Sequence, residues 1–248
     1  MQVKNYTKYQ MAAKEKVQVI LLSIVICSVV GFLFYHSFWS VFLLPVVYLI
    51  LEKRWKKDKL REIESKLMEH FINGLQVLDV SLQAGFSMEN AWKEVEKETL
   101  LLYGEQSCFY QEINAMNRTV SFNMPIELLF LTFAQRTGVE DIINFAEVMD
   151  YGKRTGSNWK RIISDTVLRM IERYETQKEI EVMVAGKRME QQVMNVVPLG
   201  MLLFLKLTSW EYMSILYGNL LGVLMMSIFL VVYGVAILWS EKIMDIQV

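Results

Sequence analysis

The sequence has few of the residues that carry catalytic or metal chemistry. It contains only two histidines and two cysteines among 248 residues. His36 and His70 lie on opposite sides of a predicted membrane span, which argues against a histidine-based metal site. Cys27 falls in an apolar run and Cys108 in a polar region, so no disulfide between them is expected.

Sequence motifs for nucleotide binding and hydrolysis are also absent. The patterns GxxxxGKS/T, GxGxxG, GxSxG and HExxH do not occur. Their absence argues against P-loop enzymes, dinucleotide-binding enzymes, serine hydrolases of the GxSxG type and zinc proteases of the HExxH type. We therefore predict that the protein is not an enzyme and that it needs neither a cofactor nor a metal.

Strand signals and single-sign charge are scarce as well. No segment sustains the alternation of apolar and polar residues that marks a half-buried strand, so an all-helical fold is predicted. The net charge is only −1, and no basic patch with interleaved aromatic residues is present. A nucleic-acid partner is therefore not expected.

Apolar and charged residues are strongly segregated along the chain. The sequence is 53% hydrophobic and 21% charged, too apolar for an ordinary soluble domain and too charged for a protein wholly inside lipid. The charges lie mostly in the middle, and the long apolar runs lie at the two ends. This distribution predicts an all-α membrane protein with a polar domain between two membrane-embedded parts.

The apolar runs predict four transmembrane helices in two hairpins. Residues 17–35 are long enough to cross a bilayer, and the run continues almost at once in residues 38–51, after His36 and Ser37. A cleaved signal peptide is the alternative for the first run, and a re-entrant or kinked segment is the alternative for the pair. Residues 193–207 and 220–239 form the second predicted hairpin, joined by an aromatic-rich outer loop at residues 209–219.

Basic residues set the predicted orientation. The cluster after the first hairpin places that end of the hairpin in the cytoplasm by the positive-inside rule, and it could also touch anionic lipid. The membrane-flanking basic residues are Lys53, Arg54, Lys56 and Lys57. We expect a multi-pass protein of the cytoplasmic (inner) membrane, with a cytoplasmic N-terminus at 1–16, the hairpins at 17–51 and 193–239, a cytoplasmic domain at 52–192, and a cytoplasmic tail at 240–248.

The polar middle is predicted to be a helical bundle built on an internal repeat. Residues 69–95 read as a helix, a glycine turn at Gly85 and a second helix that begins after Ser87, and residues 140–165 repeat this order. The matching pairs are Glu69 and Glu140, Ile72 and Ile143, Asn73 and Asn144, Val77 and Val148, Asp79 and Asp150, and Gly85 and Gly156. The alternative is a chance likeness between two amphipathic helices.

The individual helices follow from the apolar spacing and the helix breakers. They are expected near residues 60–82, 87–102, 106–116, 125–135 and 140–153, with a last helix from 158 onward. From residue 159 to 192 only Gly186 could interrupt the last helix, so it is expected to run into the third span without a loop.

Three polar residues invite a functional interpretation. Asp79 and Asp150 occupy matching repeat positions, where paired carboxylates could serve acid–base chemistry. Capping, solvent exposure or contact with a partner is the preferred interpretation for both. Lys206 lies inside the third predicted span and could mark a transport path, but we expect its side chain to extend toward water at the outer interface.

The order of parts resembles the type II secretion system F family. The resemblance is carried by VSLQAGFSMENAW, MDYGKRTGSNWKRI and the pattern NVVPLGMLLFLKL…YGNLLGVLMMSIFLVVYGVAI. Within that family, the two leading spans and the single F domain are similar to the Tad/Flp pilus-assembly platform proteins. The turn at residues 155–158 lacks the second glycine common in the family, and residues 108–122 are more irregular than its usual pattern.

The resemblance implies a non-enzymatic platform protein. Its cytoplasmic F domain would meet a hexameric secretion ATPase, and its membrane part would meet pilin or pseudopilin subunits. A paralogous platform protein or a second copy would be a further partner. Gly85, Gly156 and Pro198 match family positions, where the resemblance implies architectural roles.

Three other functions are alternatives to this one. A small transporter predicts polar residues along the spans, where only Gln18, Asn195 and Lys206 qualify. A non-enzymatic membrane scaffold unrelated to pili predicts a recognisable signalling or ligand domain, and none is visible. An enzyme with an unfamiliar site has little histidine or clustered carboxylate to use.

Overall fold

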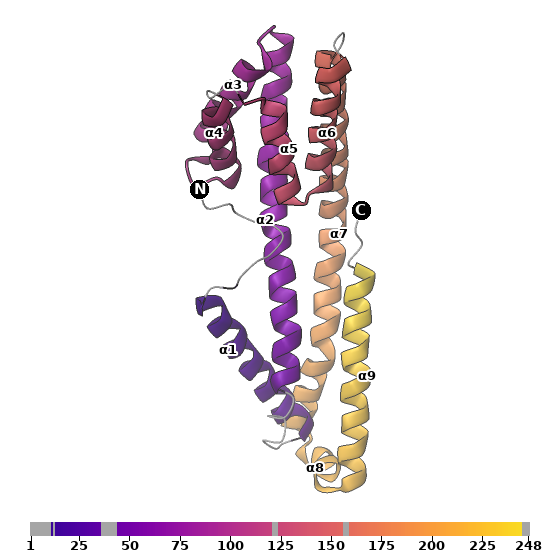
Figure 1. Ribbon diagram of the computed structural model, residues 1–248. Coiled ribbons are helices and arrows are strands. Elements are labelled where there is room, and N and C mark those ends of the chain that lie inside the picture. The colour runs from indigo at the N-terminus through magenta and orange to yellow at the C-terminus, as the bar shows by residue number, and fades with distance from the viewer. Residues whose placement is uncertain (1–10, 12, 36–43, 121–123, 156–158, 245–248) are drawn as a thin grey trace. The chain divides into compact units, whose positions relative to one another are not determined.

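The computed structural model describes residues 11, 13–35, 44–120, 124–155 and 159–244, and these residues form helices joined by short turns (Figure 1). No strand occurs among them, as the sequence predicts. The helices are α1 (Ala13–Val30), the π-helical turn η1 (Gly31–Tyr35), α2 (Leu44–Gln83), α3 (Met88–Tyr103), α4 (Cys108–Val120), α5 (Ile126–Thr137), α6 (Glu140–Thr155), α7 (Trp159–Thr208), α8 (Trp210–Gly218) and α9 (Leu220–Met244).

The chain divides into two compact units. Lys56–Thr176 form one, which we call the polar unit, while Met11–Trp55 and Gln177–Val248 form the other, the apolar unit. From residue 44 onward, the chain passes from one unit to the other inside α2 and again inside α7, so these two connections are helical.

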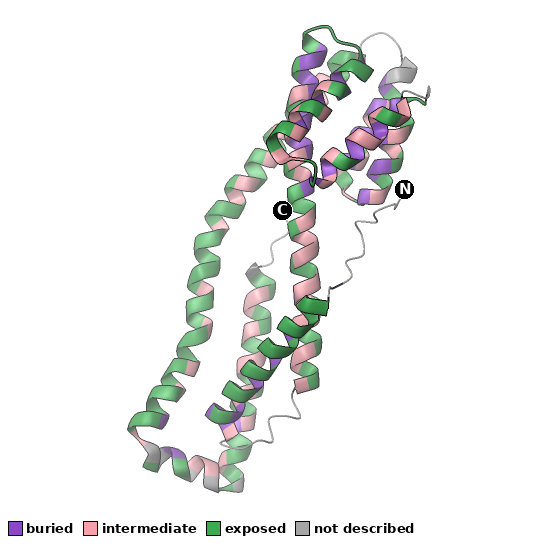
Figure 2. Cartoon of the chain, turned by 90° about the vertical axis from the view of Figure 1, so that its left-hand side faces the viewer, coloured by how far each residue is buried: buried purple, intermediate pink, exposed green. Residues whose placement is uncertain are grey.

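An aromatic core holds the polar unit together. Phe71 of α2 contacts Phe109, Phe130 and Phe145, which come from α4, α5 and α6. Trp92 of α3 stacks at a tilt on Phe130, with ring centroids 5.0 Å apart. Figure 2 shows that the buried positions gather in the helices of this unit. These ring contacts join α2 to α4, α5 and α6, and α3 to α5, so the core fixes how these five helices pack.

The turn between α2 and α3 has the geometry expected from the sequence. Gly85 has φ +92°, a value that residues with a Cβ rarely adopt. The Ser87 side chain then caps α3 by accepting a hydrogen bond from the Asn90 amide. Both predictions for this turn are confirmed. Gly156, its expected counterpart, lies outside the described residues.

A close approach of helices explains a second glycine of α2. A Cβ placed on Gly74 would lie 2.7 Å from the Phe109 ring and 3.1 Å from a Val95 methyl. Both of those side chains are fully buried. Gly74 therefore lets α3 and α4 pack directly on the backbone of α2.

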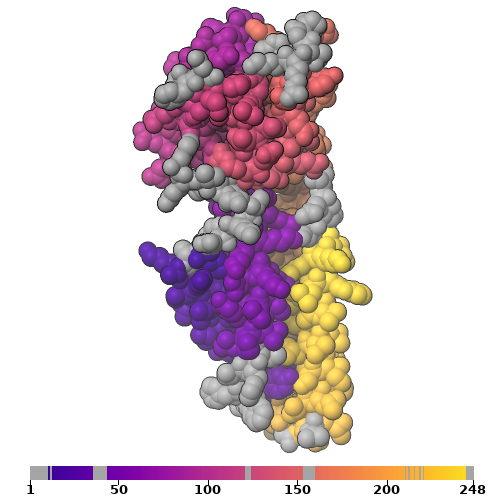
Figure 3. Space-filling view, viewed as in Figure 1, coloured from indigo at the N-terminus to yellow at the C-terminus, as the bar shows by residue number. Residues whose placement is uncertain are grey.

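Two helices of the apolar unit are long and apolar enough to cross a membrane, Ala13–Tyr35 and Leu221–Ile243. Very little of the second one is buried, and α9 lies open on the face shown in Figure 3. The core helix of a soluble protein is mostly buried, so the exposure of Leu221–Ile243 is compatible with a lipid-facing helix. By length and composition, the two helices are compatible with a membrane protein.

The other two expected spans, residues 38–51 and 193–207, are not among these two candidate helices. Residues 44–51 and 193–207 are helical, as the starts and ends of α2 and α7, while residues 38–43 lie outside the described region. Among the described residues, neither segment is one of the helices long and apolar enough to cross a membrane. They enter the proposal below.

The segment between α7 and α9 corrects one expectation. Residues 209–219 were expected to form an outer loop, but the structure has the helix α8 there. The sequence explains why this segment is helical. No glycine or proline interrupts the segment before Gly218, and Glu211 stands in the first turn, where a carboxylate favours the helix dipole. Similarly, Ser240 to Met244 of the expected tail extend α9.

Candidate functional site

One residue of the basic cluster on α2, Arg54, forms an ion pair inside the apolar unit. Arg54 forms a bidentate ion pair with Glu241 of α9, in which Arg54 Nη1 lies 2.6 Å from Glu241 Oε1. Lys53 and Lys57 are exposed, and Lys56 is half-buried. The pair joins the two predicted hairpins at one end. Arg54, which the sequence analysis singled out only for its charge, therefore has a structural role.

Polar side chains also join α7 to α9. Gln191 Nε2 donates to Ser240 Oγ at 2.7 Å, and the Tyr233 hydroxyl donates to the Asn195 carbonyl. Pro198 has no N–H to give to the carbonyl four residues earlier, that of Met194, so the Tyr233 contact lies one residue from the carbonyl that Pro198 cannot bond. Pro198 itself is exposed, and α7 continues through it.

Lys206 is buried rather than extended toward water, contrary to expectation. Only 5% of it is exposed, and its ammonium donates to the Phe32 carbonyl at the π-helical turn η1. The same ammonium lies 3.6 Å from the centre of the Phe32 ring and 5.3 Å from that of Tyr217. Tyr217 in turn donates to the Leu33 carbonyl.

This arrangement ties the end of the first apolar helix to α7 and α8. A π-helical turn leaves carbonyls pointing outside the helix ladder, and here two of them accept from Lys206 and Tyr217. The nitrogen of Lys206 is therefore enclosed by a carbonyl and two rings. An enclosed cation suits a fixed joint better than a transport path. The sequence carried a usable signal for it, a lysine within an apolar segment with aromatic residues near both segment ends.

In the polar unit, Asp79 is an internal residue. It is 7% exposed, and its carboxylate accepts hydrogen bonds from Ser164 of α7 and, at 2.7 Å, from Gln83. It thereby joins α2 to α7 within the unit. Asp150 lies half-buried on α6. Contact of either carboxylate with a partner stays a prediction.

His70 belongs to a small cluster that sequence reasoning missed. Its ring stacks on Tyr103 with centroids 3.6 Å apart, and its Nδ1 lies 2.9 Å from Ser107 Oγ. Burial lowers the pKa of His70 below its ordinary value; Lys66 acts in the same direction and Glu69 opposes it. Ser107 also accepts the Tyr110 amide at the start of α4. The serine–histidine pair therefore serves to hold a helix end.

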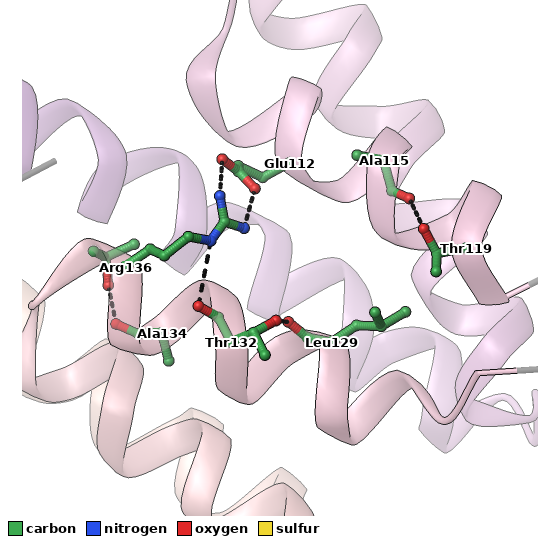
Figure 4. Close-up of polar contacts among 8 residues, drawn as sticks. Glu112, Ala115, Thr119, Leu129, Thr132, Ala134 and Arg136 are labelled. Carbon is green, nitrogen blue, oxygen red and sulfur yellow. Dashed lines mark hydrogen bonds and ion pairs between the residues drawn. The ribbon is translucent and has the colours of Figure 1, made fainter. Parts of the chain in front are cut away.

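An ion pair joins α4 to α5 in the same unit (Figure 4). The Arg136 guanidinium binds both oxygens of Glu112, at 3.0 and 2.7 Å. Arg136 also donates from Nε to the Thr132 carbonyl at 3.3 Å. The Glu112 side chain is 11% exposed and that of Arg136 is 29% exposed. The pair joins two consecutive helices through residues 24 positions apart in the sequence.

These contacts share one property, which is that they join helices. Among the described residues, no group of three or more His, Cys, Asp or Glu side chains is arranged to hold a metal ion. The polar groups described above are bonded to one another, and most of these bonds connect two helices.

Comparison with known proteins finds no match. No protein-family model matches the chain, and neither the curated proteins nor the solved structures include a match.

Proposed function

We propose that the protein is a platform of a type II secretion-like or Tad/Flp-like pilus-assembly machine in the cytoplasmic membrane. In this role it couples a cytoplasmic secretion ATPase to the extraction and assembly of pilin subunits. The proposal includes four membrane spans in two hairpins, both termini in the cytoplasm, and a cytoplasmic F domain with a helix–turn–helix pseudo-repeat. Its family basis is the resemblance of the sequence motifs and of their order.

The observation that carries the proposal is the helical passage between the units. α7 extends from Trp159 to Thr208 and contains the second predicted repeat helix, the crossing and the third predicted span. An α-helix transmits a tilt or a rotation along its axis, whereas a loop absorbs it. A protein that moves pilin by mechanical coupling needs such a connection more than it needs catalytic residues.

The joints in the apolar unit support the same role. Three contacts connect α2 to α9, α7 to α9 and α7 to η1; they are Arg54 with Glu241, Gln191 with Ser240, and Lys206 with the Phe32 carbonyl. Motion delivered through α7 would thus reach the other helices of that unit. The Gly85 turn followed by the Ser87 cap supports the first half of the proposed repeat.

A flexibility test in the native cells addresses the coupling. Residues 175–178 of α7 are replaced by four glycines, and a matched variant carries four alanines. Each glycine costs about 1 kcal/mol of helix propensity relative to alanine, so only the first variant weakens the helix. We expect both proteins in the membrane, pili in the alanine variant, and few or no pili in the glycine variant. Normal pili in the glycine variant would refute the coupling through α7.

A further inference from the structure

The proposed third span, residues 193–207, is poorly suited to a membrane by itself. It contains Asn195 and Lys206, and it is not one of the two described helices that are long and apolar enough to cross a bilayer, Ala13–Tyr35 and Leu221–Ile243. A charged side chain in a bilayer is costly unless it binds a partner or extends to water. Insertion of this segment therefore depends on how the charge of Lys206 is accommodated.

The end of the first apolar helix accommodates that charge. Lys206 is 5% exposed, its ammonium donates to the Phe32 carbonyl, and it lies 3.6 Å from the centre of the Phe32 ring. Phe32 belongs to η1, which ends at Tyr35. The last four carbonyls of a helix have no N–H partner within it, and the negative end of the helix dipole lies there. The carbonyl, the dipole and the ring thus all favour a cation at this place.

Two later elements of the chain bind the same turn. The Tyr217 hydroxyl of α8 donates to the Leu33 carbonyl, and the Tyr217 ring centre lies 5.3 Å from the Lys206 ammonium. The Tyr35 hydroxyl lies 2.9 Å from Ser227 Oγ of α9. The first apolar helix therefore supplies contacts for α7, α8 and α9 at one end of the apolar unit.

The order of synthesis places the acceptor before the charge. Phe32 precedes Lys206 by 174 positions, so the first apolar helix is made long before the end of α7. In the proposed topology, residues 13–35 and 193–207 both run from the inner to the outer side of the membrane. Phe32 and Lys206 lie near the ends of these two segments, on the same side, which agrees with their contact.

We propose that Lys206 makes the insertion of residues 193–207 conditional on docking to the end of the first apolar helix. With the Phe32 contact present, the segment spans the membrane. Without it, the charge draws the segment and α8 back to the inner side. The inference rests on the four-span topology of the proposed function, and it concerns insertion rather than pilus assembly. It also implies that a chain without the charge at position 206 no longer needs the contact.

Cysteine labelling of α8 tests this dependence in the full chain. The background carries Cys27→Ala and Cys108→Ala, and the reporter is Glu211→Cys, an exposed position of α8. A membrane-impermeant maleimide is applied to the outer face of the cytoplasmic membrane of spheroplasts. Labelling is divided by that of permeabilised cells, so that differences in protein amount cancel. Removing both rings, by Phe32→Ala with Tyr217→Leu, should lower this ratio about fivefold or more.

A suppressor separates loss of the contact from general misfolding. Adding Lys206→Leu to the variant without the two rings removes the charge, and it should restore outer labelling to that of the parent. The matched control is Phe229→Ala on α9, whose ring is 55% exposed, compared with 51% for Phe32. This control should label like the parent, because its ring lies on another helix.

The outcomes distinguish the inference from the topology on which it rests. Unchanged outer labelling without the two rings would overturn the inference, and so would a loss that Lys206→Leu does not reverse. If the parent itself labels only after permeabilisation, α8 lies on the inner side. That result would refute the four-span topology, and the inference with it.

Discussion

Replacing Arg136 with methionine should weaken the α4–α5 packing of the polar unit. The substitution keeps an apolar stem of similar length and removes the charge that binds both oxygens of Glu112. The carboxylate, with its side chain 11% exposed, would lose its strongest partner while remaining poorly hydrated. Removing one partner from a buried ion pair is more costly than replacing both.

The size of the effect follows from the distances and the exposure. Opposite unit charges about 4 Å apart attract by about 4 kcal/mol at an effective dielectric constant near 20. Arg136 keeps partial contact with water, with 29% of its side chain exposed, so we discount this figure by about half. We expect the single variant to lose about 2 kcal/mol of local unfolding free energy. Glu112→Gln should lose about 1 kcal/mol.

Hydrogen exchange of the full chain in detergent micelles measures this loss locally. Exchange rates of peptides from α4 and α5 report the opening free energy of those helices. The double variant completes a mutant cycle, in which we expect a coupling of about 1–2 kcal/mol. Lys97→Met, which breaks an exposed pair with Glu94 at 3.5 Å, serves as the control and should leave exchange unchanged. Coupling below about 0.5 kcal/mol would refute the reasoning.

Three further predictions concern the polar unit. Phe130→Ala removes a fully buried ring that contacts Trp92, and it should lower the free energy of unfolding by about 3–5 kcal/mol, measured by thermal unfolding. The control Leu128→Ala, on the exposed face of the same helix, should lower it by less than about 0.5 kcal/mol. Equal losses in the two variants would contradict the described core. Gly85→Ala forces a side chain into φ +92° and should cost about 1–2 kcal/mol in the same assay; an unchanged melting temperature would exclude that backbone geometry. Because the pKa of His70 is lowered in the fold, the folded state binds fewer protons than the unfolded state, so its contribution to stability is fully present above about pH 6.5 and is lost as the pH falls through the lowered value. Unfolding midpoints between pH 7.5 and 5 should show this loss, and His70→Gln should flatten it; identical slopes in the two proteins would contradict the assignment.

Local sequence signals predicted most helix boundaries. Ser87 capped the helix where expected, and the absence of breakers after Trp159 correctly indicated a helix running to the end of the third predicted span. These features depend on neighbours within a few residues, which the sequence displays directly. The α8 helix was missed because its aromatic residues suggested an interfacial loop, although no breaker precedes Gly218.

Contacts between distant segments could not be predicted from the sequence. Lys206 bonds the Phe32 carbonyl, and Arg136 bonds Glu112, yet no periodicity or motif indicates which residues pair. The expected exposure of Lys206 was wrong for this reason, since an isolated segment shows no acceptor for its charge. The number of spans is similarly undecided by composition alone, because short apolar helices suit protein contacts and lipid contacts equally.

The most direct test of the platform role is identification of what binds the protein in its own membranes. The tagged full chain is crosslinked in intact cells, purified in mild detergent, and its partners are identified by mass spectrometry, with the four-glycine variant of α7 in parallel. The account predicts a hexameric secretion ATPase together with pilin or a second platform protein, and it predicts that the variant retains the ATPase. Recovery of a signalling kinase or a transported solute instead, with no secretion ATPase after crosslinking, would contradict it.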